Sequence, residues 1–397
     1  MNNKLGLFIH WGVYSVYEQH EQILAKNNIP FEQYERKAME FNPIEFNPEE
    51  WVLAAKRAGM KYLCFTAKHH DGFCLWDTKY THYNIMNAAY GKDILKMVAD
   101  ACEKHGMLLS IYYSNPDWHH PNGYNPRSTH QWRAKYPDQA NDELYLEFKK
   151  NQIRELLTNY GKIYTLFWDI SPQFEDKSLN ELARSLQPDI LINDRGHDKG
   201  DFSTPERSVP EGGRFVTMTE ACQSIGEHSW AYRADEDYFS LRYLKASIDC
   251  IMARGGSYLL NVGPLPNGKL SQKSLDVLEE VGDWYNRMDG ALEDHERDPH
   301  TFVTSASECI LTKKNGKTYL HLCKGHDSTA LHIYEGLSSE VPKAARLLNN
   351  GSALRVRKGK LPYRYNEKGI CVDEFVSICD IPCDDFCGEP LVIELTW

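Results

Sequence analysis

The sequence predicts an α/β protein: a (β/α)8-like TIM barrel followed by a C-terminal antiparallel β-sandwich domain. Short apolar segments alternate with amphipathic ones from Lys4 to about Asp289, as in a parallel sheet with helical crossovers. Polar and aromatic residues follow each apolar segment, which is typical of the catalytic face of a closed barrel. After Asp289 the pattern changes to short alternating runs separated by turn residues, which indicates antiparallel strands.

We expect barrel strands at Leu5–His10, Lys61–Thr66, Met107–Tyr113, Ile163–Trp168, Asp189–Asn193, Phe215–Thr219 and Tyr258–Val262. Helical patterns lie between them at Pro48–Ala58, Ile94–His105, Asn141–Tyr160, Ser178–Leu186, Tyr238–Arg254 and Ser271–Met288. In the first of these helices we expect Trp51, Leu53, Ala54 and Ala58 to share one stripe. The length of this region favours a closed barrel over an open, doubly wound sheet.

The change of pattern near Leu292–His300 divides the chain into a barrel domain, 1–292, and a C-terminal domain, 293–397. In the second part, runs such as Ala330–Tyr334 and Leu391–Leu395 belong to alternating patterns that are broken by Asn-Gly turns. Asn-Gly pairs favour the tight turns of β-hairpins, so we expect a β-sandwich of about 100 residues here.

The composition excludes several classes of protein. Lys and Arg number 45 and Asp and Glu 56, so the net charge is −11, and we expect no nucleic-acid partner because phosphate contacts need a basic surface. No apolar run reaches the roughly 18–20 residues of a membrane helix. The 11 cysteines are scattered and odd in number, which indicates free thiols. With no signal-peptide pattern at the start, we expect a cytoplasmic protein. The sequence carries no signal for an oligomeric state.

The ends of the predicted strands carry an unusual number of reactive side chains. They include His10, His69, His70, Tyr112, Asp169, Arg195, Glu206 and Glu220. Each has an ordinary structural explanation when taken alone, such as a histidine buried in the core or an aspartate that caps the next helix. Together, alternating with aromatic residues at one end of a barrel, they predict a pocket for a polyhydroxylated ring such as a sugar.

Two carboxylates are sufficient for glycoside hydrolysis. Asp169 closes an apolar strand, so its orientation should be fixed, and Glu206 follows past the next strand, so both can face one cavity. A separation of about 5–5.5 Å would predict retention of configuration at the anomeric carbon, and about 6.5–9.5 Å would predict inversion.

A metal site is the alternative use of the histidines. The candidates are His10, His69-His70 and His119-His120. Neighbouring residues of a strand point to opposite faces, so His69 and His70 should not bind one ion unless the strand has already ended. We therefore expect no catalytic metal.

Several motifs resemble the alpha-L-fucosidases of glycoside hydrolase family 29. The matching segments are Phe8-Ile9-His10-Trp11-Gly12-Val13-Tyr14-Ser15, Ala67-Lys68-His69-His70-Asp71-Gly72-Phe73, Tyr112-Tyr113-Ser114, Asn193-Asp194-Arg195 and Gly255-Gly256-Ser257-Tyr258-Leu259-Leu260-Asn261-Val262-Gly263-Pro264. They occur in the family's order across the whole barrel region. The resemblance implies a barrel with a β-sandwich and a retaining, exo-acting enzyme that needs neither a metal nor an organic cofactor.

The resemblance also implies roles for individual residues. Asp169 corresponds to the nucleophile, and Glu206, in the segment Asp201–Glu206, to the general acid/base, with Glu220 in reserve. The positions that would contact fucose are His10, Glu21, His69, His70, Tyr112 and Arg195, with Phe167 as an aromatic wall. The substrate would be a fucosylated oligosaccharide or glycoside.

Two positions depart from the family pattern inside the site. Ile170 stands where the family commonly has glycine, directly after the nucleophile, and Gln22 stands where many members have tryptophan. Two alternative functions therefore remain: a glycosidase for a related sugar such as an alpha-L-galactoside, and a non-catalytic carbohydrate-binding relative.

Overall fold

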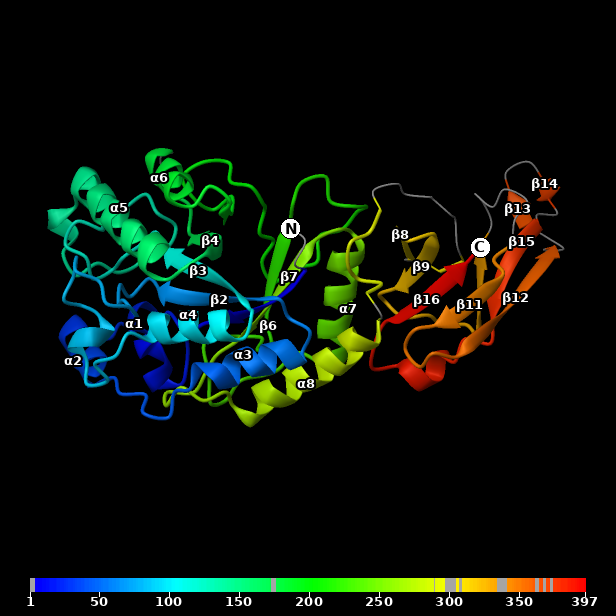
Figure 1. Ribbon diagram of the computed structural model, residues 1–397, viewed down its shortest axis with the longest axis horizontal. Helices are drawn as coiled ribbons and strands as arrows, with labels where there is room; N and C mark the ends of the chain where they lie inside the picture. Colours follow the sequence, from blue (N-terminus) through cyan, green and yellow to red (C-terminus); the bar gives the residue numbers. More distant parts are fainter. Residues whose placement is uncertain are drawn as a thin grey trace.

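The fold was established from a computed structural model. The structure describes residues 4–172, 176–288, 290–296, 305–306, 309–333, 341–360, 364–366, 369–371 and 374–397. The described molecule is elongated: the N-terminal α/β part lies at one end and the C-terminal β part at the other, with α7 (Leu241–Ala253) between them (Figure 1).

A parallel seven-stranded sheet forms the N-terminal part, in the order β5-β4-β3-β2-β1-β7-β6. Its strands are β1 (Leu5–Ile9), β2 (Tyr62–Lys68), β3 (Leu108–Ser114), β4 (Ile163–Asp169), β5 (Leu191–Ile192), β6 (Glu220–Ser224) and β7 (Ser257–Val262). The helices of this part are α1 (Ile23–Lys26), α2 (Phe31–Glu40), α3 (Pro48–Arg57), α4 (Ile94–Lys104), α5 (Asp142–Asn159), α6 (Ser178–Leu186), α7 and α8 (Gln272–Arg287).

The segment 202–206 bridges the two edge strands of this sheet. Phe202 pairs with Asn193, just after β5, while Ser203 and Glu206 pair with Thr219 and Cys222 at β6, all in parallel fashion. Main-chain hydrogen bonds accompany these bridges, including one from Cys222 N to Pro205 O at 3.0 Å. The segment therefore supplies an eighth rung, which closes the sheet into a (β/α)8-like barrel.

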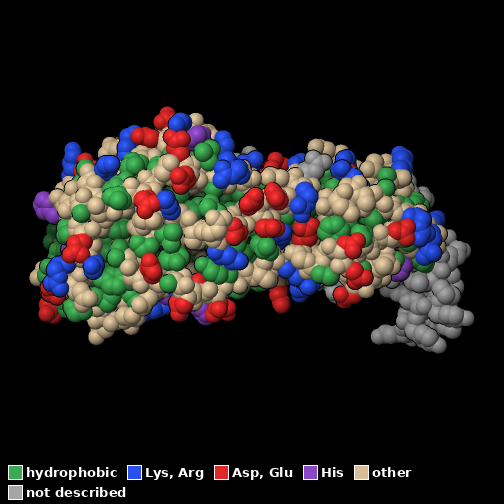
Figure 2. Space-filling view, turned by 90° about the horizontal axis from the view of Figure 1, so that it is seen from below, with side chains coloured by type: hydrophobic (Ala, Val, Ile, Leu, Met, Phe, Trp, Pro, Cys, Tyr) green, Lys and Arg blue, Asp and Glu red, His purple; other side chains and the backbone are tan. Residues whose placement is uncertain are grey.

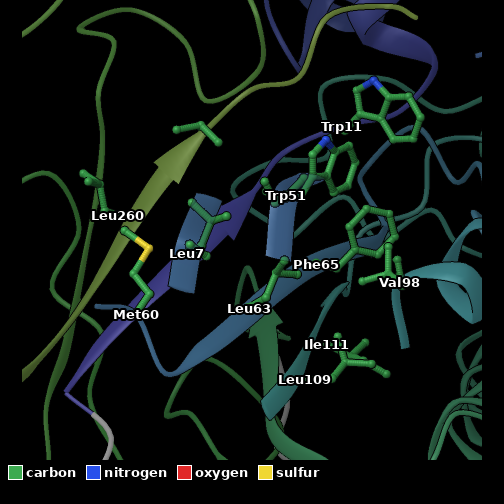
Figure 3. Close-up of a cluster of buried hydrophobic side chains, with 14 of the residues drawn as sticks. Leu7, Trp11, Trp51, Met60, Leu63, Phe65, Val98, Leu109, Ile111 and Leu260 are labelled. Atoms are coloured by element: carbon green, nitrogen blue, oxygen red, sulfur yellow. The ribbon is translucent and has the colours of Figure 1, made fainter. Parts of the chain in front are cut away.

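Side chains alternate between the inside and the outside of the barrel, as the period of two requires. Residues such as Leu7, Leu63 and Ile111 point outward and pack against Trp51 of α3 and Val98 of α4 (Figure 3). Their neighbours form a second buried cluster inside the barrel, made of Phe8, Tyr62, Cys64, Tyr112, Phe167, Cys222 and Leu259. The polar side chains at the carboxyl ends of the strands pack against this inner cluster.

Side-chain caps start most of the long helices. Asn47, Asp93, Asn141, Ser240 and Ser271 precede α3, α4, α5, α7 and α8, and each accepts a hydrogen bond from a main-chain N–H of the first turn. Such caps typically contribute about 1 kcal/mol each to helix stability.

The C-terminal part is an antiparallel seven-stranded sheet in the order β10-β15-β12-β11-β16-β9-β8, together with the short pair β13-β14. The strands are β8 (Ile310–Lys314), β9 (Lys317–Leu322), β10 (Ala330–Ile333), β11 (Ala344–Leu347), β12 (Ala353–Lys360), β13 (Arg364–Asn366), β14 (Gly369–Cys371), β15 (Glu374–Cys379) and β16 (Leu391–Thr396). Strands from both ends of the sheet share one buried cluster, which includes Leu320 and Ile333. The sheet is therefore curled over its own core, as in a β-sandwich.

The two parts meet at α7. Asp249 Oδ1 lies 2.7 Å from His321 Nδ1 of β9, and neither residue is exposed. The predicted boundary between residues 292 and 293 lies after α8 and before β8, and it stays a prediction; part of the expected transition, 297–300, lies outside the described residues.

The predicted strands coincide with β1–β5 and β7 to within two residues at each end, whereas the sixth was wrong. We expected Phe215–Thr219, but β6 starts at Glu220. The residues before β6 form a loop in which Val216 is fully exposed. Among the helices of the described residues, none combines the length and the apolar character needed to cross a membrane. Acidic and basic side chains are interspersed over the face shown in Figure 2.

Candidate active site

A pocket of about 530 Å³ opens at the carboxyl ends of the barrel strands. Its lining is Phe8, His10, Glu21, Gln22, His69, His70, Tyr112, His130, Phe167, Asp169, Ile170, Arg195, Glu206, Cys222 and Trp230. The structure therefore gathers every predicted site residue into one pocket except Glu220.

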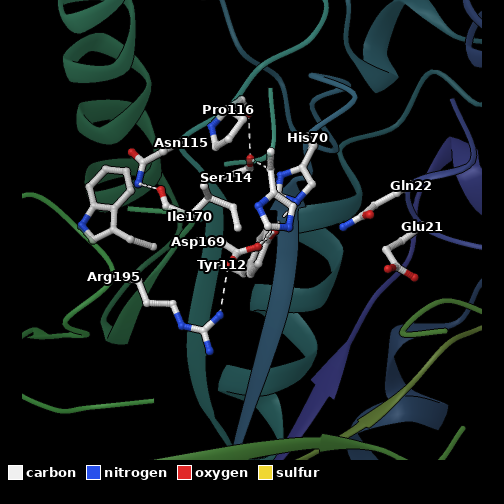
Figure 4. A network of polar contacts seen from close by, with 12 residues as sticks. Glu21, Gln22, His70, Tyr112, Ser114, Asn115, Pro116, Asp169, Ile170 and Arg195 are labelled. Carbon is white, nitrogen blue, oxygen red and sulfur yellow. Dashed lines mark hydrogen bonds and ion pairs between the residues drawn. The ribbon is translucent and has the colours of Figure 1, made fainter. Parts of the chain in front are cut away.

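Asp169 is the last residue of β4, and its carboxylate is held by Tyr112 and Arg195 (Figure 4). Tyr112 Oη donates a hydrogen bond of 2.6 Å to Oδ2, and Arg195 Nη1 lies 3.1 Å from Oδ1. His70 Nε2 lies 3.7 Å from Oδ2. Burial by itself would raise the pKa of Asp169, but His70, Arg195 and the Tyr112 hydrogen bond outweigh it, so the pKa lies below its usual value. Asp169 is therefore an oriented, ionised carboxylate.

Glu206 stands across the pocket on the eighth rung of the barrel. Arg195 Nη1 lies 2.7 Å from Glu206 Oε2 and 3.1 Å from Asp169 Oδ1, so these two oxygens are at most 5.8 Å apart, the sum of the two distances. That limit excludes, for these atoms, the 6.5–9.5 Å spacing of inverting enzymes. The Glu206 side chain is 40% exposed, so it can exchange protons with water.

Arg195 is itself fixed by the eighth rung. Its Nε donates to Thr204 Oγ1 at 2.7 Å, and its Nη2 donates to the Thr204 carbonyl at 2.8 Å. The guanidinium also lies over the ring of Phe167, at 5.5 Å from the centroid. Arg195 is therefore a rigid bridge between the two carboxylates.

Trp230 forms an aromatic wall that the sequence analysis missed. Its ring stacks on His10 with centroids 5.2 Å apart, and Arg207 lies over it at 4.5 Å. Glu21 Oε2 holds this segment by accepting hydrogen bonds of 3.0 Å from Trp230 N and from Ser229 Oγ. Trp230 follows the carboxyl end of β6, where a barrel places its site residues. It was overlooked because the sixth strand was predicted too early in the chain. His130, on the loop that follows β3, was missed as well.

His10 and His70 are neutral hydrogen-bonding groups. Burial lowers the pKa of each to about 4. Ser114 Oγ donates to the Pro116 carbonyl and lies 2.6 Å from His70 Nδ1, so Nδ1 carries the proton and Nε2 can accept a hydrogen bond. His10 Nδ1 faces Asn261 Oδ1 at 2.7 Å and is likewise the protonated nitrogen.

The strand ends before His69 and His70, which is the exception that the sequence analysis allowed for their approach to one another. β2 ends at Lys68, so both histidines lie beyond the strand and their ring centroids are 4.1 Å apart. Ligand atoms of His69, His70 and Asp169 lie within 4.8 Å of one another. The charge of Arg195 beside Asp169 opposes a second cation at this position.

Glu220, the reserve acid/base, lies at the opposite end of the barrel. It is the first residue of β6, it pairs with Ser257 at the start of β7, and it accepts a hydrogen bond from Tyr62 Oη at the start of β2. Because the strand starts rather than ends at Glu220, this carboxyl cannot face Asp169. Burial raises the pKa of Glu220 to about 7.

Ile170, the residue after Asp169, has a left-handed backbone with φ of 57°. A β-branched residue is rarely found in this region, and such a conformation costs on the order of 1–3 kcal/mol. The Ile170 carbonyl accepts a hydrogen bond of 2.9 Å from Asn115 Nδ2. The backbone therefore turns sharply after Asp169, and Ile170 is among the residues that line the pocket.

Comparisons with known proteins point to one family. The model of the family described as "Alpha-L-fucosidase" matches residues 1–289. A solved structure, alpha-L-fucosidase isoenzyme 1 from Paenibacillus thiaminolyticus, is 31% identical, with a TM-score of 0.81 over 100% of this chain and 97% of its own. Alpha-L-fucosidase AlfC from Lactobacillus casei, in complex with its alpha-L-fucose product, is 30% identical, with a TM-score of 0.66 over 72% of this chain and 98% of its own. Human plasma alpha-L-fucosidase is 29% identical over 71% of this chain, and the match spans 66% of that protein.

Proposed function

Because the chain belongs to the alpha-L-fucosidase family, glycoside hydrolase family 29, we propose that it is a retaining, exo-acting alpha-L-fucosidase. Its substrates would be glycans or glycosides that end in an alpha-L-fucosyl residue. The observation that supports the proposal is the pair Asp169 and Glu206 on either side of Arg195, whose Arg195-contacting oxygens are at most 5.8 Å apart, below the spacing of inverting enzymes. None of the comparisons supports the related-sugar or the non-catalytic alternative.

In the first step, Asp169 attacks the anomeric carbon while Glu206 gives its proton to the glycosidic oxygen. The bond from that carbon to the leaving oxygen breaks, and a fucosyl ester on Asp169 forms. The lowered pKa of Asp169 keeps it ionised for this attack, and Tyr112 and Arg195 keep it oriented. The step needs an acid and a nucleophile within one sugar ring of each other, which the shared contact with Arg195 provides.

In the second step, Glu206 accepts a proton from water, and that water displaces Asp169 from the anomeric carbon. Two displacements on one carbon restore the original configuration, so alpha-L-fucose is the first product. His10, His69 and His70 offer neutral imidazole nitrogens to the hydroxyls of the ring, and Trp230 and Phe167 offer apolar walls to its C–H faces.

The anomeric configuration of the product tests the mechanism directly. Proton NMR would follow hydrolysis of 4-nitrophenyl alpha-L-fucoside, and we expect the alpha anomer to appear before mutarotation produces the beta anomer. First appearance of the beta anomer would overturn the retaining mechanism. In the same assay, a panel that includes the alpha-L-galactoside tests the sugar: faster hydrolysis of the galactoside would overturn the assignment to fucose.

We also propose a reducing, cytoplasmic location. Cysteines of the described part of the chain such as Cys64, Cys74 and Cys222 have free thiols, and disulfides persist mainly in oxidising compartments. Fractionation of the source cells with an antibody to the protein tests this, and recovery outside the cytoplasm would contradict it.

A further inference from the structure

Two buried asparagines hold the main chain on either side of Asp169. Asn193, which follows β5, exchanges two hydrogen bonds with Trp168: its Oδ1 accepts from Trp168 N at 2.9 Å, and its Nδ2 donates to Trp168 O at 2.8 Å. Asn115, which follows β3, donates from its main-chain N to the Asp169 carbonyl at 3.0 Å and from Nδ2 to the Ile170 carbonyl at 2.9 Å (Figure 4). Neither asparagine lines the fucose pocket.

The Asn115 bonds fall where the main chain is strained. Ile170 has φ of 57°, which a β-branched residue avoids unless its surroundings impose it. If the Ile170 carbonyl lost its donor, the residue would be free to return to a negative φ. Because Ile170 shares a peptide group with Asp169, that rotation would move the carboxylate relative to Glu206.

Asn115 is held in turn by two residues from neighbouring elements. Tyr145 Oη of α5 donates to the Asn115 carbonyl at 2.6 Å. His197 Nε2 lies 2.9 Å from Asn115 Oδ1, and because the amide nitrogen already donates to Ile170, Nε2 is the donor of this bond. The other nitrogen, His197 Nδ1, is buried without a partner, in agreement with a neutral ring that carries its proton on Nε2.

We propose that Asn115 and Asn193 are positioning residues, which keep the Asp169 carboxylate aligned for attack through the main chain of residues 168–170. This inference rests on the proposed function, because it needs Asp169 to be the nucleophile. The two asparagines act on β4 from the strands on its two sides, so the alignment does not depend on the substrate. Their loss should therefore lower kcat and leave KM largely unchanged.

The experiment compares Asn115→Ala with the unsubstituted enzyme on an aryl alpha-L-fucoside. We expect kcat to fall about 10–100-fold, since a displacement near 1 Å can cost about that much, while KM changes less than about threefold. Asn84→Ala is the matched control: Asn84 is also buried, and it bonds to the main chain of Thr78 and Thr81 away from the pocket. We expect this control to lower the unfolding temperature but to keep kcat.

Ile170→Gly distinguishes positioning from general loss of structure. Glycine adopts positive φ freely, so the main chain of this variant no longer tends to rotate away. We therefore expect Asn115→Ala to lower kcat by less than about threefold in the Ile170→Gly background. Equal losses in both backgrounds, or an unchanged kcat in Asn115→Ala, would overturn the inference.

A conservative variant and the activity of the unsubstituted enzyme complete the experiment. Asn115→Asp has the same shape but no amide donor when it is ionised, so it should also lower kcat; a folded Asn115→Asp with full kcat would overturn the inference even if the alanine variant does not fold. Turnover by the unsubstituted enzyme reports on the proposed function separately. An inactive unsubstituted enzyme overturns that function and this inference with it, whereas an active enzyme with an insensitive Asn115 overturns the inference alone.

Discussion

Arg195 Nη1 lies 3.1 Å from Asp169 Oδ1, and the same nitrogen contacts Glu206. One guanidinium thus sets the spacing of the two carboxylates. Main-chain register alone would fix it less firmly, because Glu206 lies on a rung made of isolated bridges rather than on a regular strand. The side chain of Arg195 supplies the rigidity that the eighth rung lacks.

Replacing Asp169 by asparagine should abolish turnover and preserve the fold. Asparagine has the same shape but cannot act as a nucleophile, so we expect kcat to fall by about 10⁴-fold or more, as for other essential nucleophiles. Initial rates on an aryl fucoside measure the loss, and a thermal unfolding curve checks the fold. Undiminished turnover would remove Asp169 from the role of nucleophile.

Replacing Glu206 by alanine should produce an enzyme that azide rescues. Without its acid/base the variant still forms the ester on Asp169 when the leaving group is good, and azide needs no deprotonation to attack it. Two displacements give alpha-L-fucosyl azide, which has the configuration of the substrate. Mass spectrometry and NMR of the product identify it. If azide neither restores the rate nor appears in the product, Glu206 is not the acid/base.

Stability should fall as the pH falls from about 6.5 to 4. His10 and His70 have a pKa near 4 in the folded protein, because they are buried, and about 6.5 when unfolded. In this window the unfolded chain binds more protons than the folded protein does. Each histidine therefore lowers the free energy of unfolding as the pH falls, by on the order of 2 kcal/mol at pH 5. Urea unfolding midpoints between pH 7 and 5 measure the trend.

His10→Gln is the control for this trend, because glutamine does not titrate. Its unfolding midpoint should fall less between pH 7 and 5 than that of the unsubstituted protein. An identical fall in both proteins would show that His10 does not contribute.

The sequence predicted the site well where a regular strand carries the residue. His10, Tyr112 and Asp169 lie in or directly after strands whose apolar pattern is clear, so their common edge followed from the barrel itself. The eighth rung was not predicted as a strand, because 202–206 contains a single large apolar residue, Phe202, and has no alternating pattern. Glu206 was nevertheless singled out, first as a carboxylate that follows the fifth strand and then through the family resemblance.

The misplaced sixth strand led to two errors about the site, one at Glu220 and one at Trp230. Phe215–Thr219 is rich in the aromatic and β-branched residues that are typical of strands, whereas Glu220–Ser224, which actually pairs with β7, contains no β-branched residue, so the local pattern favoured the wrong segment. Placing the strand too early put Glu220 at the catalytic end and hid Trp230, which follows the true strand. Pairing with a neighbouring strand is a non-local property, and sequence periodicity does not contain it.

Glu220→Gln should leave catalysis intact and stabilise the protein at high pH. Glu220 is fully buried at the far end of the barrel, where one carboxyl oxygen accepts from Tyr62 and the other has no partner. Burial raises its pKa to about 7 from about 4.5, so the folded state binds more protons between these values. Ionisation of Glu220 therefore lowers the free energy of unfolding progressively as the pH rises from 4.5. The loss reaches its maximum, about 3 kcal/mol, above pH 7.

Glutamine mimics the protonated carboxyl and carries no charge at any pH. The urea unfolding midpoint of Glu220→Gln, relative to the unsubstituted protein, should therefore be higher at pH 8 than at pH 5. Its kcat on an aryl fucoside should stay within about twofold, and azide should have no effect, in contrast to Glu206→Ala. A large loss of kcat that azide restores would return Glu220 to the catalytic pair and would contradict the placement of β6, because a carboxyl at the amino end of that strand cannot reach the sugar.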